Sequence, residues 1–228
     1  AYNNILGSGD ILVHAGDCTS MGKSHEITNF LNWFGMTDFK HKIFIAGNHD
    51  FCFEKVNQPH HKGDYDWFHN LMNEENLSQS NVVYLEDSGF TIESPEFKRP
   101  VKFWGSPWQP EFYNWAFNLP KGGWELEQKW KDIPDDIDIL ITHGPAWGML
   151  DDVEGRRGDH LGCELLAERI KQIKPKIHIC GHIHTGYGHY YDGHTHYFNA
   201  AVLNERYNYA HLPWHIDWNP ITNEITFL

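Results

Sequence analysis

The sequence lacks the features of a membrane-spanning or secreted chain. No segment approaches the roughly 18 consecutive apolar residues that cross a bilayer, and the N-terminus has no basic-then-apolar signal pattern. Only 4 cysteines occur in 228 residues, and no two have the Cys-x-x-Cys spacing. A chain of this length can form a core without disulfides, so we expect a soluble protein of the reducing cytoplasm.

Basic residues are also scarce. The chain has 18 Lys and Arg against 31 Asp and Glu, which gives a net charge of -13. A field of this sign repels polyanions and argues against a large nucleic-acid surface, but a small phosphate ligand is still compatible because bound cations can reverse the local potential. Hydrophobic residues make up 40% of the chain, which excludes disorder, and the length favours one domain over residues 1–228.

Apolar runs alternate with helical patterns, which predicts an α/β fold with added antiparallel strands. The expected strands cover 11–15, 42–46, 82–85, 90–92, 101–104, 137–141 and 177–180, and the expected helices cover 24–36, 64–76, 124–131 and 163–173. Ser24 is the expected N-cap of the first helix. Residues 87–89 are expected to form a hairpin turn into the strand at 90–92, and residues 105–123 a long ordered loop.

Four of the apolar strands end in short glycine-containing turns that present Asp, Asn or His. The turns are Gly16–Asp17, Gly47–Asp50, His143–Pro145 and Gly181–His184. Because the carboxyl ends of strands in an α/β sheet converge on one crevice, we expect these side chains at a common rim. Carboxylate, amide and imidazole ligands together suit Mn, Fe or Zn rather than Ca or a thiolate cluster.

In order, spacing and strand context, the four turns resemble the signature of the calcineurin-like metallophosphoesterase family: GD, GNH[DE], a single His after a strand, and GHxH. The resemblance runs from Asp17 to His184. Within this family, the stretches 105–110 and 181–188 are similar to those of the metallophosphoesterase-domain-containing proteins. The resemblance implies a four-layer α/β/β/α sandwich in which two mixed sheets are flanked by helices.

The resemblance also implies a role for each of these residues. The implied metal ligands are Asp17, Asn48, His143, His182 and His184. Asp17 would bridge two divalent ions, most readily Mn²⁺ with Fe, Zn or Mg as alternatives, and His184 would ligate the ion that the remaining three residues do not. His49 would be the catalytic histidine, and Asp50 would support it rather than bind metal.

The function implied is hydrolysis of nucleotide-type phosphodiesters by a metal-bridging hydroxide. A phosphomonoesterase using the same site, and a nucleotide-binding protein with lost or weak turnover, stay open as alternatives. Trp108 in the aromatic loop would offer a face to a base, and Arg156 or Arg157 would bind a phosphate oxygen. The plainer alternatives are aromatic packing over the sheet and solvated loop charges.

The chain departs from the family pattern at its start. The family has an Asp-x-His motif at the end of its first strand, and residues 1–9 contain none. We expect that motif and its strand to lie upstream of residue 1 in the natural protein. The alternative is a truncated or degenerate site that holds one ion at most.

Overall fold

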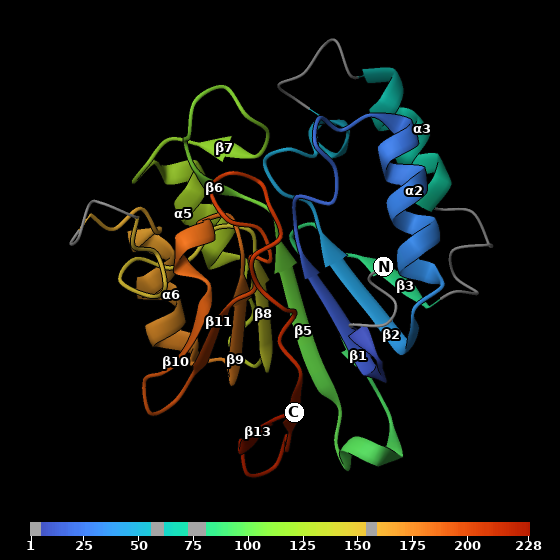
Figure 1. The fold of residues 1–228 in the computed structure, drawn as a ribbon. Coiled ribbons are helices and arrows are strands. Elements are labelled where there is room, and N and C mark those ends of the chain that lie inside the picture. Colours follow the sequence, from blue (N-terminus) through green and yellow to red (C-terminus); the bar gives the residue numbers. More distant parts are fainter. Residues whose placement is uncertain (1–5, 56–61, 73–80, 154–158) are drawn as a thin grey trace.

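In the computed structural model, which describes residues 6–55, 62–72, 81–153 and 159–228, two β-sheets face each other and helices cover their outer faces (Figure 1). The smaller sheet consists of the parallel strands β1 (Ser8–Ala15), β2 (Asp38–Ile45) and β3 (Val82–Tyr84). The larger sheet has the order β10 (Gly188–Tyr191), β11 (His196–Asn199), β9 (Ile177–Cys180), β8 (Ile139–Thr142), β5 (Val101–Ser106) and β4 (Ser88–Ile92). This sheet is mixed, because β10 and β4 run antiparallel to their neighbours.

Helices α2 (Ser24–Gly35) and α3 (Lys62–Met72) lie beside the smaller sheet, and α5 (Trp124–Lys131) and α6 (Glu164–Ile173) lie beside the larger one (Figure 1). Two short strand pairs are added: β6 (Gln109–Pro110) with β7 (Asn118–Leu119), and β12 (Ile216–Trp218) with β13 (Ile225–Phe227). Single 3-10 turns form at Phe51–Phe53, Pro95–Phe97 and His184–Gly186. The arrangement confirms the expected α/β/β/α sandwich.

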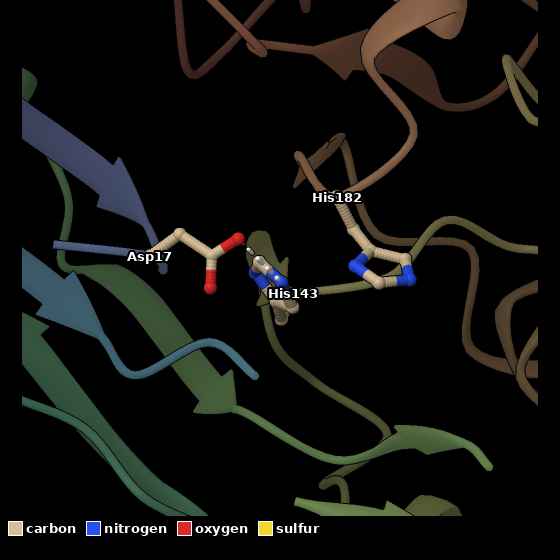
Figure 2. Close-up of side chains that lie close together, drawn as sticks. All are labelled: Asp17, His143 and His182. Atoms are coloured by element: carbon tan, nitrogen blue, oxygen red, sulfur yellow. Dashed lines mark ion pairs between the residues drawn. The ribbon is translucent and has the colours of Figure 1, made fainter. Parts of the chain in front are cut away.

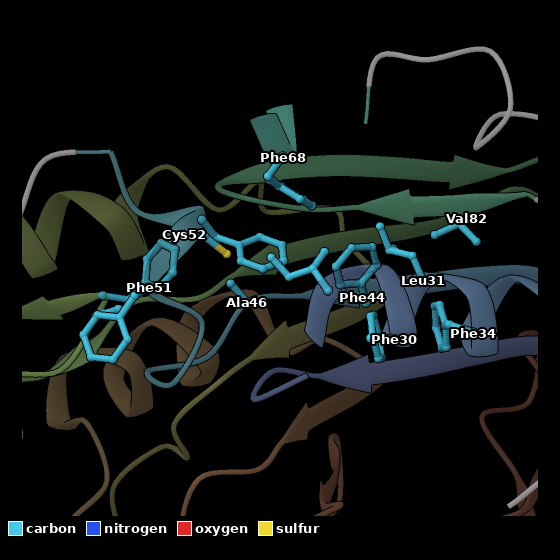
Figure 3. Packing of buried hydrophobic residues seen from close by; sticks show 13 residues of the cluster. Phe30, Leu31, Phe34, Phe44, Ala46, Phe51, Cys52, Phe68 and Val82 are labelled. Atoms are coloured by element: carbon cyan, nitrogen blue, oxygen red, sulfur yellow. The ribbon is translucent and has the colours of Figure 1, made fainter. Parts of the chain in front are cut away.

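Strand periodicity explains how one chain builds three buried clusters between four layers. Successive side chains of a strand point to opposite faces of its sheet. In β2, Ile43 and Ile45 therefore join the cluster between the two sheets, whereas Phe44 joins the cluster beneath α2 and α3 (Figure 3). In β8, Ile139 and Ile141 face the other sheet, while Leu140 packs in the cluster beneath α5 and α6. Both faces are covered at residues 43–45 of β2 and 139–141 of β8, and there the sequences are continuously apolar.

Three local expectations were wrong. Residues 87–89 do not join a hairpin: β3 pairs with β2 in the smaller sheet, and β4 pairs with β5 in the larger one. Ser24 is the first helical residue rather than the N-cap, and the Glu26 carboxylate instead accepts the backbone N–H groups of residues 20, 21 and 23. The loop expected at 105–123 contains β6 and β7. The strand pairing depends on tertiary partners that a local pattern does not reveal, whereas the start of the helix is set locally by Glu26.

No helix within the described ranges is both long and apolar enough to cross a membrane.

The buried carboxylate of Asp151 accepts hydrogen bonds from backbone N–H groups in the segment that follows β8. Asp151 is 1% exposed, and its Oδ2 atom accepts the N–H groups of Gly148 at 3.0 Å and Gly162 at 2.9 Å. Its Oδ1 atom lies 2.7 Å from Nδ1 of His160. The hydrogen bond and the charge of Asp151 raise the pKa of His160 above its usual value.

This pair predicts a pH-dependent contribution to stability. A histidine whose pKa is raised by folding contributes stability that is complete below its unfolded pKa and is lost as pH rises through the folded pKa. We therefore expect the difference in free energy of unfolding between wild type and His160→Gln, measured by urea titration, to be largest near pH ~5.5 and to shrink by pH ~8.5. In an Asp151→Asn background the pH dependence of this difference should become smaller, because only the weaker charges of Asp152 and Asp159 then act on His160. A difference that grows with pH would contradict the assignment.

Candidate metal centre

Each of the four glycine-containing turns follows its strand, as expected. Asp17 comes after β1, Asn48 after β2, His143 directly after β8 and His182 after β9. Since β1 runs parallel to β2 and β8 runs parallel to β9, the carboxyl ends within each sheet share one edge. The two sheets then bring their edges together, because the Nδ1 atom of His143 reaches the carbonyl of Ala15 at 2.9 Å.

Four polar side chains meet at this edge. The donor atoms of Asp17, His143 and His182 all lie within 4.8 Å of one another (Figure 2). The Oδ1 atom of Asn48 lies between the two imidazoles, 2.9 Å from Nε2 of His143 and 2.8 Å from Nδ1 of His182. The Oδ2 atom of Asp17 lies 3.4 Å from Nε2 of His143. No other group of three His, Cys, Asp or Glu donors lies this close within the described ranges.

The chemistry of this donor set fits a divalent metal ion. It combines one carboxylate oxygen, one amide oxygen and two imidazole nitrogens, a mixture that first-row divalent ions accept. Asn48 and His143 are 2% and 1% exposed, whereas a quarter of the Asp17 side chain is exposed. The cluster is therefore held by buried groups and opens to solvent on the Asp17 side.

The charges in the cluster are coupled. Burial alone would lower the pKa of His143, but the charge and hydrogen bond of Asp17 raise it above the usual value. Conversely, burial would raise the pKa of Asp17, but His143 and His49 hold it well below the usual range. Burial, with the charge of His143 second, lowers the pKa of His182 to about 3, so that this imidazole is neutral at physiological pH, the form that binds metal.

Asp50 fixes the turn after β1 to the turn after β2. Its carboxylate is fully buried and accepts the backbone N–H groups of Cys18 at 3.2 Å, Thr19 at 2.9 Å and Gly47 at 2.8 Å, together with the Thr19 hydroxyl at 2.6 Å. Burial, together with the charge of Asp17, raises the pKa of Asp50 to about 6. This geometry agrees with a supporting residue rather than a metal ligand.

The turns leave no room for larger residues. A Cβ atom on Gly47 would lie 2.3 Å from Oδ1 of Asp17 and 2.6 Å from Cε1 of His143. Asp17 itself has φ +56°, a left-handed conformation that is costly for a residue other than glycine. The backbone N–H of His49 donates to Oδ1 of Asp17 at 3.0 Å and holds the carboxylate in place.

The other two histidines predicted for the site, His49 and His184, lie beside the cluster. Nδ1 of His49 donates to the carbonyl of Ser20 at 2.9 Å, and Nδ1 of His184 donates to the carbonyl of Asn204 at 2.9 Å. In both rings this bond occupies Nδ1, so Nε2 is the nitrogen that can bind a metal or exchange a proton. His184 is not among the donors that lie within 4.8 Å of one another, so the described residues assemble one metal position and place His184 outside it.

Comparison with known proteins decides the family. The model of the calcineurin-like phosphoesterase family matches residues 2–186, most of the chain.

The chain belongs to the calcineurin-like phosphoesterase family.

Membership implies a hydrolase, and the relatives agree with it. Metallophosphoesterase domain-containing protein 1 of Homo sapiens is 42% identical over 218 residues, which cover 92% of this chain and 64% of that protein, and the Mus musculus protein of the same name gives the same values. This phosphoesterase chain thus spans less than two thirds of their length. The structure of phosphopantetheinyl hydrolase (PptH) from Mycobacterium tuberculosis has a similar fold, with a TM-score of 0.57 at 16% identity, covering 88% of this chain and 81% of that one.

The sequence predicts substrate contacts at Trp108, Arg156 and Arg157. Trp108 packs edge-on against Phe117, donates its indole N–H to Asp87 at 2.8 Å and lies under the Lys129 ammonium. These contacts are those of a residue packed in the structure, and none of them is with the metal cluster. Arg156 and Arg157 lie outside the described residues.

Other aromatic side chains contact the histidines of the site. The ring of Trp115 lies 4.2 Å from that of His49, and the ring of Phe112 lies 5.7 Å from that of His182. Tyr207 is 64% exposed, and the centroid of its ring lies 6.1 Å from that of His49 and 5.5 Å from that of His184. The aromatic richness of residues 112–117 gave a signal for the first two. Nothing in the sequence pattern placed Tyr207 near the site, because its loop follows β11 without any motif.

The role of Asp50 predicts a stability effect. Asp50→Asn keeps the shape but turns an amide N–H₂ toward N–H donors, so buried donors lose their acceptor. We expect the free energy of unfolding, measured with urea, to fall by about 3 kcal/mol. The exposed Asp136→Asn, which breaks only a surface ion pair with Lys102, should lower the free energy of unfolding far less. Equal costs for the two variants would contradict the anchoring role.

Proposed function

We propose that this chain is the hydrolytic part of a phosphodiesterase that acts on nucleotide-type esters with two divalent ions, Mn²⁺ foremost. The observation that carries the proposal is the convergence of Asp17, Asn48, His143 and His182 within hydrogen-bonding and ligand distance. Oxygen and imidazole donors are compatible with Mn²⁺ and make no use of thiolate. His184 is the residue that we assign to the second ion.

The residues have distinct tasks in such a reaction. Divalent ions held at the cluster would supply Lewis acidity that offsets the charge of the phosphoryl group in transfer. His49 lies beside this position, and because its Nδ1–H bonds to the carbonyl of Ser20, Nε2 is the ring nitrogen that this bond leaves available. Nε2 of His49 can therefore hold a proton and donate it to the oxygen of the leaving group. Asp50 keeps His49 in place through the turn that both residues share.

The aromatic side chains at the site support a substrate with a flat group. Trp115, Tyr207 and Phe112 come from two separate loops and each contacts a histidine of the site. A nucleobase or aryl ester can stack on such faces, whereas a small alkyl ester gains nothing from them. This is the reason to favour nucleotide-type diesters.

We also propose that the chain functions in the cytoplasm. Cys18, Cys163 and Cys180 are free thiols, and Cys163 and Cys180 are buried. A reducing compartment keeps such thiols in this state.

Activity should depend on metal and on His182. With bis(p-nitrophenyl) phosphate and Mn²⁺ we expect turnover that a chelator abolishes and that His182→Ala lowers by at least about 100-fold. The exposed His194→Ala serves as the matched control and should keep wild-type activity. A folded wild-type chain that binds nucleotide but hydrolyses neither phosphodiesters nor phosphomonoesters would overturn the proposal. A preference for monoesters of about tenfold or more would replace the diester assignment by a phosphomonoesterase.

Tyr207 should affect the KM for aromatic esters. Loss of a stacking face costs about 1 kcal/mol or more, so Tyr207→Ala should raise KM for an aryl nucleoside diester about fivefold or more and leave kcat nearly unchanged. Tyr207→Phe should retain the wild-type KM. Tyr190→Ala on β10, also exposed, is the control for removing a surface tyrosine. An equal rise in KM for a dialkyl phosphate would contradict stacking.

A further inference from the structure

The loop that carries His182 adopts a backbone conformation that needs external support. His182 has φ +64°, in the left-handed region that residues other than glycine rarely occupy. Such a conformation persists only where the surrounding structure imposes it. The N–H of Gly181 donates to the carbonyl of His143 at 2.9 Å, and the N–H of Ile183 donates to the carbonyl of Gly181 at 2.7 Å, so backbone hydrogen bonds fix the start of the loop and span His182 itself.

The side chain of Asn199 adds support from outside the loop. Asn199 ends β11 and lies opposite Cys180, the last residue of β9, in the parallel register of the two strands. It is fully buried, and its Nδ2 atom donates to the carbonyl of Ile183 at 2.9 Å and lies 3.5 Å from the carbonyl of Gly181. One amide group thus contacts the peptide carbonyls on both sides of His182.

The same side chain connects this loop to the segments that follow β8 and β11. Nδ2 of Asn199 also donates to the carbonyl of Leu150 at 3.2 Å, and Oδ1 accepts the N–H of Ala201 at 3.0 Å. Every polar atom of the amide is therefore used. The packing is close: a Cβ atom on Gly186 would lie 1.9 Å from the carbonyl oxygen of Leu150 and 2.7 Å from Nδ2 of Asn199.

We propose that Asn199 is a positioning residue that holds His182 in the orientation required to bind metal, acting through the carbonyls that flank it. Nothing in the sequence pattern marks it, since it lies 17 positions beyond His182 in a strand without a motif. Substitution of a residue that orients a metal ligand commonly lowers the metal affinity about 10- to 100-fold. The proposal rests on the metal centre proposed above.

The test compares Asn199→Ala with Thr195→Val. Thr195 is a matched control, because it is equally buried, lies just before β11 at the opposite end from Asn199, and gives one side-chain hydrogen bond, 2.6 Å, to the carbonyl of Pro175, away from the metal cluster. We expect Asn199→Ala to weaken Mn²⁺ binding by about tenfold or more. Binding is measured by calorimetry on folded protein, at a temperature below the lowest unfolding midpoint among the variants. Thr195→Val should lower thermal stability but change the Mn²⁺ affinity by less than about twofold. Asn199→Ser, which retains one donor, should give an intermediate affinity and replaces Asn199→Ala if that variant does not fold.

A second readout needs no metal. In the metal-free wild type, Nδ1 of His182 bonds to Asn48, so its imidazole ¹⁵N resonances report that ring orientation. We expect Asn199→Ala to change the His182 resonances and Thr195→Val to leave them unchanged. If Asn199→Ala keeps both the resonances and the Mn²⁺ affinity, or if the two variants lose affinity equally, the positioning role is wrong. A wild type that binds no Mn²⁺ would overturn the proposed metal centre, while the resonances would still decide the role of Asn199.

Discussion

The carboxylate of Asp50 joins two turns that the sheet alone cannot hold together. Parallel pairing of β1 with β2 ends at Ala15 and Ile45, and the chain beyond these residues has no ladder partner. Asp50 replaces that ladder by accepting N–H groups from both turns. Asp17 and Asn48 lie on these two turns, so the distance between a carboxylate and an amide oxygen of the cluster depends on a third residue that binds no metal. A buried charge is tolerated there because so many donors surround it.

Two residues of the cluster have left-handed backbones, and their support comes from different places. Asp17 is held by neighbours in the turn after β2, through the His49 N–H and the Gly47 backbone, which has no side chain. His182 is held from β11, a strand of the other sheet. Strained residues concentrate where the surrounding structure determines them, and each conformation costs about 1–3 kcal/mol. The sandwich therefore does more than bring the turns close, because each sheet supplies the contacts that hold one strained ligand.

The strand-end turns could be predicted from the sequence because each is a local signal. An apolar run that ends in a short glycine-containing turn with a ligand-type residue points to Asp17, Asn48, His143 and His182 without knowledge of the fold. The supporting contacts could not be predicted, since Asn199 and Tyr207 act through chain segments distant in sequence and carry no periodic pattern. The failed hairpin at 87–89 has the same origin: a turn signal indicates that the chain reverses, but the partner strand is chosen by the sheets.

Metal binding and substrate contact use different parts of the chain, and single hydrogen bonds connect them. The aromatic segment 112–117 is tied to the cluster where the N–H of Ala116 donates to the carbonyl of Asn48 at 3.1 Å. The carbonyl of Asn204 accepts both Nδ1 of His184 and the N–H of Tyr207, so that the second aromatic loop is fixed to the other histidine. The aromatic faces are thus set in position relative to the cluster by backbone groups. Side chains on these loops can therefore change without disturbing the donor atoms of the cluster.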